Sequence, residues 1–205
     1  DVNALIVGGS RGLGECTAKL ISAGGGKSVI TYFQGAKDAA LVQADINSMG
    51  GFCEILAVDI DQLDNIKINF QQSGINQLYY FASPKILSER GNVFDAKQKY
   101  AKFYCHNFKR LVNNLIRELD SLSIFYPSTV YINEKKRGFE EYIKAKLGGE
   151  SICQELVLTN SDINIIFPRL PVLQTDQNQS IAGKPQNSMH NATILLPEIR
   201  RMKAL

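Results

Sequence analysis

A cluster of glycines near the N-terminus limits the folds available to this chain more than any other feature of its sequence. Gly8, Gly9, Gly12 and Gly14 directly follow an apolar stretch and open a segment with helical periodicity. Glycine has no Cβ, so the turn can be tight and a phosphate can approach the backbone, while the helix N-terminus presents N–H groups and a partial positive charge. The pattern predicts a strand, a turn and a helix that bind a pyrophosphate. A glycine turn without a ligand is the alternative.

Short apolar runs alternate with helical segments along most of the chain. Strands are predicted at residues 2–7, 28–33, 52–58, 76–81, 122–126 and 164–167. Helices are predicted between them, with apolar side chains at spacings of three and four. The longest ones cover 100–119 and 138–158. This alternation predicts an α/β fold, a Rossmann-like doubly wound parallel sheet of six to seven strands with helices on both faces.

The composition indicates which kinds of partner the chain is expected to bind and in which cellular compartment it is expected to work. The net charge is +3 with scattered Lys and Arg, which gives no case for nucleic acid as a partner. Four distant cysteines and two isolated histidines predict no metal site and a reducing, cytoplasmic setting. No run reaches the roughly 20 apolar residues of a membrane span, so no membrane partner is expected.

The end of the second predicted strand distinguishes between two dinucleotides. NAD sites usually carry an Asp or Glu about 20 residues after the glycine turn, which binds the ribose 2′-hydroxyl. Here the segment 31–34, Thr-Tyr-Phe-Gln, has no acidic side chain that would repel a 2′-phosphate. Arg11, with help from Lys37, can pair with that phosphate. NADP(H) is therefore the expected cofactor, with a solvated surface role for Arg11 as the alternative.

These residues resemble the short-chain dehydrogenases and reductases, whose motif T-G-x-x-x-G-x-G aligns with residues 7–14. The resemblance extends to about residue 175 and implies an NADPH-dependent oxidoreductase of the carbonyl or keto reductase type. Its small-molecule substrate would be a ketone, with a 3-oxoacyl compound or a related biosynthetic intermediate as one option. The implied cofactor-binding residues are Gly8, Ser10, Arg11, Gly12, Leu13, Gly14, Tyr32, Asp59, Ala82, Tyr142, Lys146 and Thr175.

The active site of that family includes a tyrosine and a lysine spaced as Y-x-x-x-K on a helix. Tyr131 with Lys135 and Tyr142 with Lys146 both match. Only the second pair lies in a predicted helix, where a spacing of four places both side chains on one face. The resemblance implies that Tyr142 is the acid/base and that Lys146 holds the nicotinamide ribose. A nearby ammonium is expected to lower the tyrosine pKa. A surface pair without a role is the alternative.

The family also has a serine and an asparagine in its active site. Ser128 and Thr129 both precede Tyr142 by a suitable distance, and we prefer Ser128 because the segment Tyr-Pro-Ser resembles the family's strand end. Thr129 remains open, as does a turn without a catalytic role. Asn107 is the best match to the asparagine, and would position a water that relays protons to Lys146. A plain surface asparagine is equally compatible.

The chain also departs from the family pattern. Val7 replaces the usual Thr, the segment 80–83 reads Tyr-Phe-Ala-Ser in place of N-N-A-G, and Arg169 follows Pro168 where glycine is usual. Arg169 is expected either to meet an anionic substrate group or to form a salt bridge within the fold. Because of these departures, a non-catalytic NADP-binding or scaffold domain is the alternative function.

We expect one NADP-binding domain over residues 1–205, because no repeat or boundary divides the sequence. After Phe167, prolines interrupt a polar stretch that predicts a loop or lid. Residues 168–205 are therefore expected to form a shortened substrate loop and C-terminal segment. The chain is either one module of a larger protein or a domain with a short N-terminus. A homodimer through the two long crossover helices, or contact with neighbouring domains, is the expected assembly.

Overall fold

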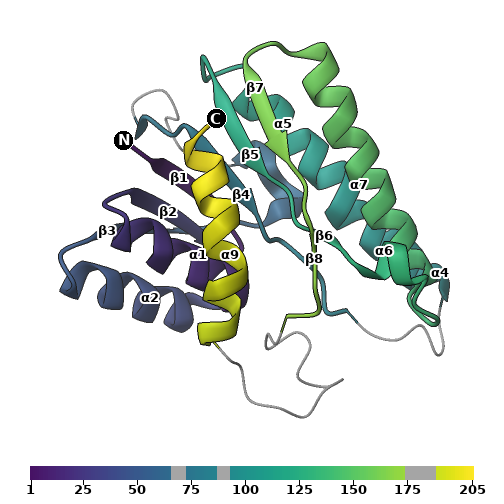
Figure 1. The fold of residues 1–205 in the computed structure, drawn as a ribbon, viewed down its shortest axis with the longest axis horizontal. Helices are drawn as coiled ribbons and strands as arrows, with labels where there is room; N and C mark the ends of the chain where they lie inside the picture. Colours follow the sequence, from purple (N-terminus) through teal and green to yellow (C-terminus); the bar gives the residue numbers. More distant parts are fainter. Residues whose placement is uncertain (66–72, 87–92, 174–187) are drawn as a thin grey trace.

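The computed structural model describes residues 1–65, 73–86, 93–173 and 188–205, and its centre is a six-stranded parallel sheet (Figure 1). The strand order is β3-β2-β1-β4-β5-β7. The strands are β1 Asn3–Val7, β2 Lys27–Tyr32, β3 Phe52–Ala57, β4 Gln77–Tyr80, β5 Leu122–Phe125 and β7 Ile163–Ile166. All six predicted strands are confirmed, with ends that differ by one residue at most. The chain winds in opposite directions from β1 and β4, whose carboxyl ends form the switch point of a doubly wound sheet.

Helices cover both faces of this sheet (Figure 1). On one face lie α1 Gly12–Ala23, α2 Ala36–Ser48 and α9 Ser188–Lys203. On the other lie α4 Val93–Ala101, the π-helical turn η2 Lys102–Asn107, α5 Phe108–Leu115 and α7 Glu140–Thr159. The short helices are η1 Ile60–Asn65 and α6 Tyr131–Glu134. None of the described helices combines the length and apolar character needed to cross a membrane.

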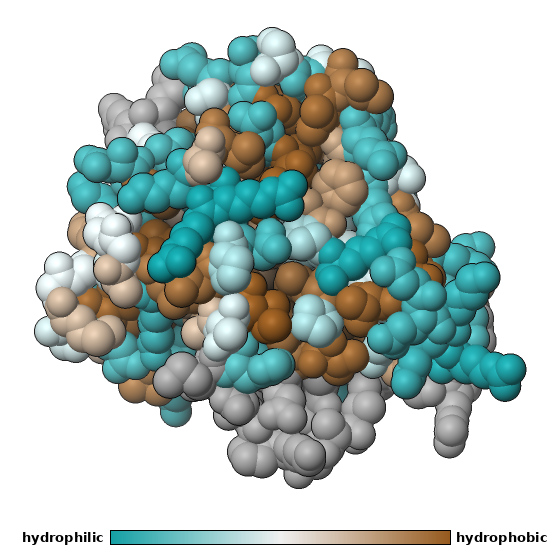
Figure 2. All heavy atoms as spheres, in the orientation of Figure 1, coloured by the Kyte–Doolittle hydropathy of each residue, from teal (hydrophilic) through white to brown (hydrophobic). Residues whose placement is uncertain are grey.

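Alternation along the central strand divides the buried side chains between two cores. Leu5 and Val7 of β1 pack toward the face with α5 and α7, whereas Ala4 and Ile6 pack toward the face with α1, α2 and α9. Successive side chains of a strand point to opposite faces, so one apolar run supplies both cores. Hydrophilic side chains lie between apolar ones on the outer surface seen in Figure 2. The end of β1 that forms the switch point is therefore packed on both faces of the sheet.

Helix α9 was not predicted from the sequence, which indicated only a polar, proline-broken segment there. It packs against α1 and buries Leu195 and Met202, and the Gln77 side chain donates a hydrogen bond to the Met202 carbonyl at 3.1 Å. Pro197 lies inside the helix and weakens its sequence signal. Part of the expected C-terminal loop segment therefore completes the α1 face of the fold.

Candidate active site

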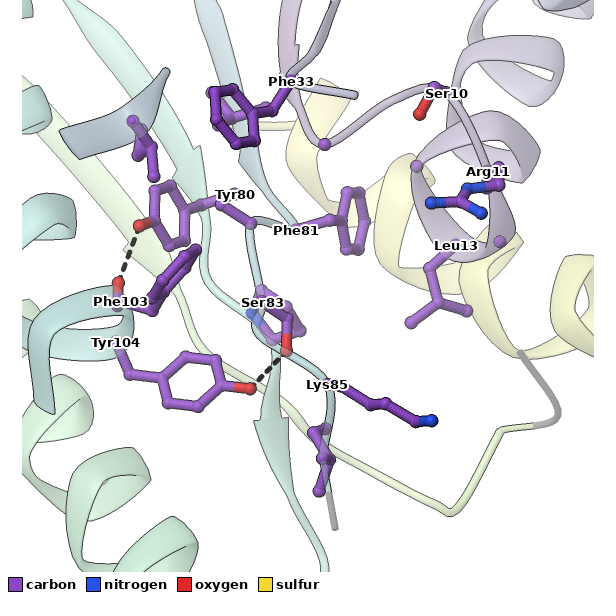
Figure 3. Close-up of a pocket in the computed structure, with 18 of the residues that line it drawn as sticks. Ser10, Arg11, Leu13, Phe33, Tyr80, Phe81, Ser83, Lys85, Phe103 and Tyr104 are labelled. Carbon is purple, nitrogen blue, oxygen red and sulfur yellow. Dashed lines mark hydrogen bonds between the residues drawn. The ribbon is translucent and has the colours of Figure 1, made fainter. Parts of the chain in front are cut away.

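A cavity of about 730 Å³ lies at the carboxyl ends of β1 and β4. Figure 3 shows Ser10, Arg11 and Leu13 on one side of it and Phe103 and Tyr104 on the other. The volume is within the range of small-molecule and cofactor sites. Most residues implied by the sequence line this cavity: Gly8, Ser10, Arg11, Gly12, Leu13, Gly14, Tyr32, Asp59, Ala82, Ser128, Tyr142 and Lys146.

The glycine turn folds tightly enough to bring its backbone to the cavity. Gly8 and Gly12 have φ values of 81° and 60°, a region in which side chains are strained. A Cβ on Gly14 would lie 2.2 Å from the Gly8 carbonyl oxygen. Arg11, the residue before α1, makes no side-chain hydrogen bond that caps the helix. The first N–H groups of α1 therefore remain available to an anion in the cavity.

A threonine on the neighbouring strand anchors this turn, and sequence reasoning missed it. The Gly8 amide donates to Thr31 Oγ1 at 3.1 Å, and the Gly9 amide donates to the Thr31 carbonyl at 2.9 Å. Thr31 is at the end of β2 and is buried. Val7 of β1, which stands where the family usually has Thr, gives the turn no hydroxyl. Thr31 supplies a hydroxyl from the adjacent parallel strand.

Arg11, the residue expected to pair with the 2′-phosphate of NADP(H), lies next to an acidic side chain. Arg11 Nε lies 3.5 Å from Asp38 Oδ2, and both side chains are largely exposed. An exposed pair of this kind contributes little to stability, so the guanidinium can still bind a ligand. Ser10 and Tyr32 line the cavity beside it. Arg11 therefore lines the cavity at the glycine turn, and Asp38 is a neighbour that was not predicted.

Asp59 and Ala82 lie on the β3 and β4 sides of the cavity. Both Asp59 oxygens accept hydrogen bonds within η1, one from the Asp61 amide at 2.9 Å and one from Gln62 Nε2 at 3.2 Å. The Ala82 amide nitrogen would lie 3.1 Å from a Cβ built on Gly8. The turn after β4 thus packs directly on the glycine turn. Thr175, the remaining implied cofactor contact, lies outside the described residues.

Tyr142 and Lys146 lie together at the inner end of the cavity, both buried and both on α7. Lys146 Nζ donates to the Pro127 carbonyl at 2.7 Å. The same nitrogen lies 4.0 Å from the centre of the Tyr104 ring, and the Tyr142 ring meets Tyr104 edge-on at 5.6 Å between centres. The helix periodicity that selected this pair in the sequence therefore brings both side chains into one site.

The prediction that Tyr142 has a lowered pKa beside Lys146 is wrong. Burial raises the pKa of Tyr142, and a hydrogen bond with Thr129 only partly offsets this. Burial also lowers the pKa of Lys146 to about 7, so its amine is only partly charged at neutral pH. The phenol is consequently protonated at neutral pH. That state suits a proton donor, which a carbonyl reduction requires.

The two candidate hydroxyls point to different partners. Ser128 and Thr129 form the short strand β6, Ser128–Thr129, which pairs with β8, Arg169–Leu170. Ser128 Oγ donates to Glu150 at 2.5 Å, whereas Thr129 hydrogen-bonds Tyr142. Adjacent strand residues face opposite sides, so only one of them can reach the tyrosine. The structure brings Thr129, and not Ser128, next to Tyr142.

The Asn107 side chain hydrogen-bonds a residue of η1. Its Nδ2 donates to Asp61 Oδ1 at 2.8 Å, and it is not among the described residues that line the cavity. Tyr104, one turn earlier on η2, occupies the space beside Lys146. A π-helical turn has a wider repeat than an α-helix and rotates the faces that follow it. Tyr104 was not among the predicted site residues, because the resemblance implies an asparagine in this part of the chain.

Arg169 forms the internal salt bridge that was one of its two expected roles. Its Nε and Nη2 atoms donate to Glu150 Oε1 and Oε2 at 2.8 and 2.7 Å, and Nη1 donates to Asn133. This pairing lowers the pKa of Glu150, and the Ser128 hydrogen bond acts in the same direction. The bridge ties β8 to α7, and so holds Thr129 of the paired strand β6 beside Tyr142.

Replacing Glu150 by Gln is expected to lower the free energy of unfolding at pH 7 by about 2 kcal/mol, a buried-pair value reduced because Arg169 is partly exposed. The depressed carboxylate pKa stabilises the fold above the ordinary pKa of 4.5 and loses this effect as the pH falls through the folded value. The difference from wild type should therefore narrow below about pH 4.5. Urea denaturation across pH measures it.

Glu155→Gln on the same helix is the control. Glu155 pairs with Lys109 at 2.8 Å, and both side chains are exposed. Its loss should cost less than about 0.5 kcal/mol. Equal destabilisation by the two variants, or a Glu150→Gln difference that does not depend on pH, would contradict this account of the Glu150–Arg169 bridge.

No model of a known protein family matches the sequence, and no curated protein matches it. Solved structures match its fold closely. A short chain dehydrogenase from Burkholderia cenocepacia in complex with NADP superposes with a TM-score of 0.81 at 18% identity, over 95% of this chain and 88% of that one. A 3-oxoacyl (acyl-carrier-protein) reductase from Agrobacterium tumefaciens with NADP bound gives 0.78 at 14% identity, over 94% and 84%.

An alternative dihydrofolate reductase from Brucella suis in complex with NADP gives a TM-score of 0.75 at 14% identity, over 96% of this chain and 87% of that one. The names of these proteins describe different activities, so the shared fold does not select a substrate. The agreement in fold nevertheless extends over nearly the whole chain. The chain therefore has the fold of the short-chain dehydrogenases and reductases.

Proposed function

We propose that this protein is an NADPH-dependent oxidoreductase that reduces a ketone to an alcohol. The observation that carries the proposal is the position of Tyr142, Thr129 and Lys146 at the inner end of the cavity whose outer end is the glycine turn. The residues at the start of α1 would hold the pyrophosphate of a dinucleotide, and Tyr142 would line the part of the cavity that takes its reactive ring. A carbonyl substrate then lies within reach of both.

The described residues fit a dinucleotide phosphate. The N–H groups at the start of α1 have no side-chain cap from Arg11, and the glycine turn leaves no room for a Cβ on Gly14. Arg11 offers a guanidinium for a 2′-phosphate, and the segment 31–34 has no carboxylate to repel it. Several solved structures of this fold contain NADP, which supports the same choice of cofactor.

NADPH, when bound, supplies the hydride that reaches the carbonyl carbon. Tyr142 donates its phenolic proton to the carbonyl oxygen, so that hydride and proton together give the alcohol. The Thr129 hydroxyl hydrogen-bonds the same oxygen as negative charge develops there. Lys146 would hold the nicotinamide ribose, and its positive charge, when present, would lie near the phenolate that forms as the proton leaves. Burial nevertheless keeps the pKa of Tyr142 raised before the reaction. The apolar walls from Phe139, Leu170 and nearby residues limit water around the reacting atoms.

The cofactor proposal predicts a selective effect of Arg11→Gln. The variant should bind NADPH about tenfold more weakly, because a charge-assisted hydrogen bond to the 2′-phosphate is lost, and should bind NADH within about twofold of wild type. Fluorescence titration of both nucleotides into both proteins measures this. Equal weakening for NADH would show that Arg11 contacts another part of the nucleotide, and an absence of binding to wild type would exclude the cofactor.

A second candidate function is a non-catalytic NADP-binding or scaffold domain. The observation in its favour is that the Asn107 side chain donates a hydrogen bond to Asp61 and is not among the described residues that line the cavity, which weakens the case for the proton relay implied by the resemblance. NADPH consumption against a panel of ketones and 3-oxoacyl thioesters distinguishes the two. Turnover supports the reductase, whereas tight NADPH binding without turnover of any compound favours the scaffold.

A further inference from the structure

Lys146 sits in a cage of aromatic rings. Its side chain is 5% exposed, and its amine lies 4.0 Å from the ring centre of Tyr104, 5.0 Å from that of Tyr126 and 6.0 Å from that of Tyr142. An ammonium group has three N–H donors. Among the described residues its one hydrogen-bond acceptor is the Pro127 carbonyl. The rings therefore take the place that water or further acceptors would fill around the charge.

Tyr104 is the nearest of these rings and is fixed on several sides. It is 2% exposed and lies on the π-helical turn η2. Its hydroxyl shares a hydrogen bond with Ser83 in the turn after β4, as Figure 3 shows, and its carbonyl accepts a hydrogen bond from Tyr126 at 3.0 Å. Its ring also packs edge-on against Tyr142. A ring held this firmly presents its face to Lys146 without further loss of side-chain entropy.

We propose that Tyr104 is a positioning residue for Lys146, whose amine it holds at the inner end of the cavity by a cation–π contact. The consequence for turnover rests on the proposed reductase function, whereas the contact between ring and amine does not. Tyr104 need not touch the substrate or the nucleotide in this role. It acts by keeping the amine in place and by favouring its charged form.

Electrostatics around the amine support this role. Burial is the main cause that lowers the Lys146 pKa to about 7, so modest contributions decide how much of it is charged at neutral pH. A cation–π contact at a desolvated site stabilises the charged form by a small number of kcal/mol at most, enough to shift a pKa by about 0.5 to 1.5 units. The other titratable groups that face the amine are Tyr142, Glu150 and Cys153 of α7, Cys105 of η2, and Tyr126 after β5.

The test compares variants that keep or remove the ring in the full chain. Tyr104→Phe keeps the ring, whereas Tyr104→Leu and Tyr104→Met remove it and still fill space, the flexible Met guarding against a Leu variant that does not fold. NMR of protein with 13Cε-labelled lysine follows the Lys146 titration, and the Lys146 signal is identified by its absence in Lys146→Met. This readout needs neither substrate nor cofactor.

The proposal expects the Lys146 midpoint to fall by about 0.5 to 1.5 pH units in Tyr104→Leu and Tyr104→Met, and to stay within about 0.3 unit of wild type in Tyr104→Phe. A midpoint unchanged by loss of the ring, or shifted as far by Phe as by Leu, would overturn it. With an active substrate, the pH profile of kcat should move with the midpoint. Turnover by none of the proteins would count against the reductase function, and the NMR result would still decide the role of Tyr104.

Discussion

Tyr142→Phe is expected to reduce ketones about 10²- to 10⁴-fold more slowly than wild type, the usual contribution of a positioned general acid. The substitution removes the proton donor and retains the ring that packs against Tyr100, Tyr104 and Tyr131. Because the phenol is deep in the cavity, NADPH affinity and the free energy of unfolding should change little. Steady-state NADPH consumption gives the rate, and fluorescence titration with thermal melting checks binding and folding.

Tyr131→Phe is the matched control for this prediction. Tyr131 is the other tyrosine in a Y-x-x-x-K match, lines the same cavity and packs against Tyr142. It lies on α6, however, and Lys135 follows that helix with a φ of 47°, so this pair does not share a helical face. Its variant should retain activity within about threefold of wild type. A larger loss of activity in Tyr131→Phe than in Tyr142→Phe would show that Tyr131, and not Tyr142, is the proton donor.

The positions of the strands were predictable from the sequence because a parallel strand buried on both faces is a mostly apolar run. β1 and β5 show this directly, since both faces of each are covered by helices. The elements that were missed lack such a signal. β6 and β8 have two residues each, too few for any periodicity, and α9 contains Pro197 after a polar segment. Tertiary packing on α1 stabilises that helix in spite of its sequence.

In the candidate site too, residues placed by local structure were predictable and residues placed by tertiary packing were not. The glycine turn and the pair Tyr142 and Lys146 follow from local geometry, because a turn or a helix alone fixes their relative positions. The choice between Ser128 and Thr129 depends on which side of β6 faces α7. The orientation of β6 is set by its pairing with β8, some 40 residues along the chain. Tyr104 is brought to Lys146 by a π-helical turn that the sequence pattern does not reveal.

Gly14→Ala is expected to destabilise the protein by about 3 kcal/mol and to weaken NADPH binding at least about tenfold. Helix propensity alone predicts the opposite, since Ala favours a helix over Gly by about 1 kcal/mol. The new Cβ would lie 2.2 Å from the Gly8 oxygen and 2.8 Å from the Gly9 Cα, so α1 and the glycine turn would have to separate. That movement displaces the N–H groups proposed to bind the pyrophosphate. Urea denaturation and NADPH titration measure the two effects.

Gly24→Ala at the other end of α1 separates sterics from propensity. A Cβ there meets only the Ile21 and Leu20 carbonyl oxygens, at 3.4 and 3.6 Å, and the backbone has an ordinary φ of −86°. This variant should change the free energy of unfolding by less than about 1 kcal/mol and leave NADPH affinity unchanged. If Gly14→Ala were as stable as Gly24→Ala and bound NADPH as well as wild type, the close approach of α1 to the turn could not be what shapes the site. The nucleotide would then have to bind elsewhere in the cavity.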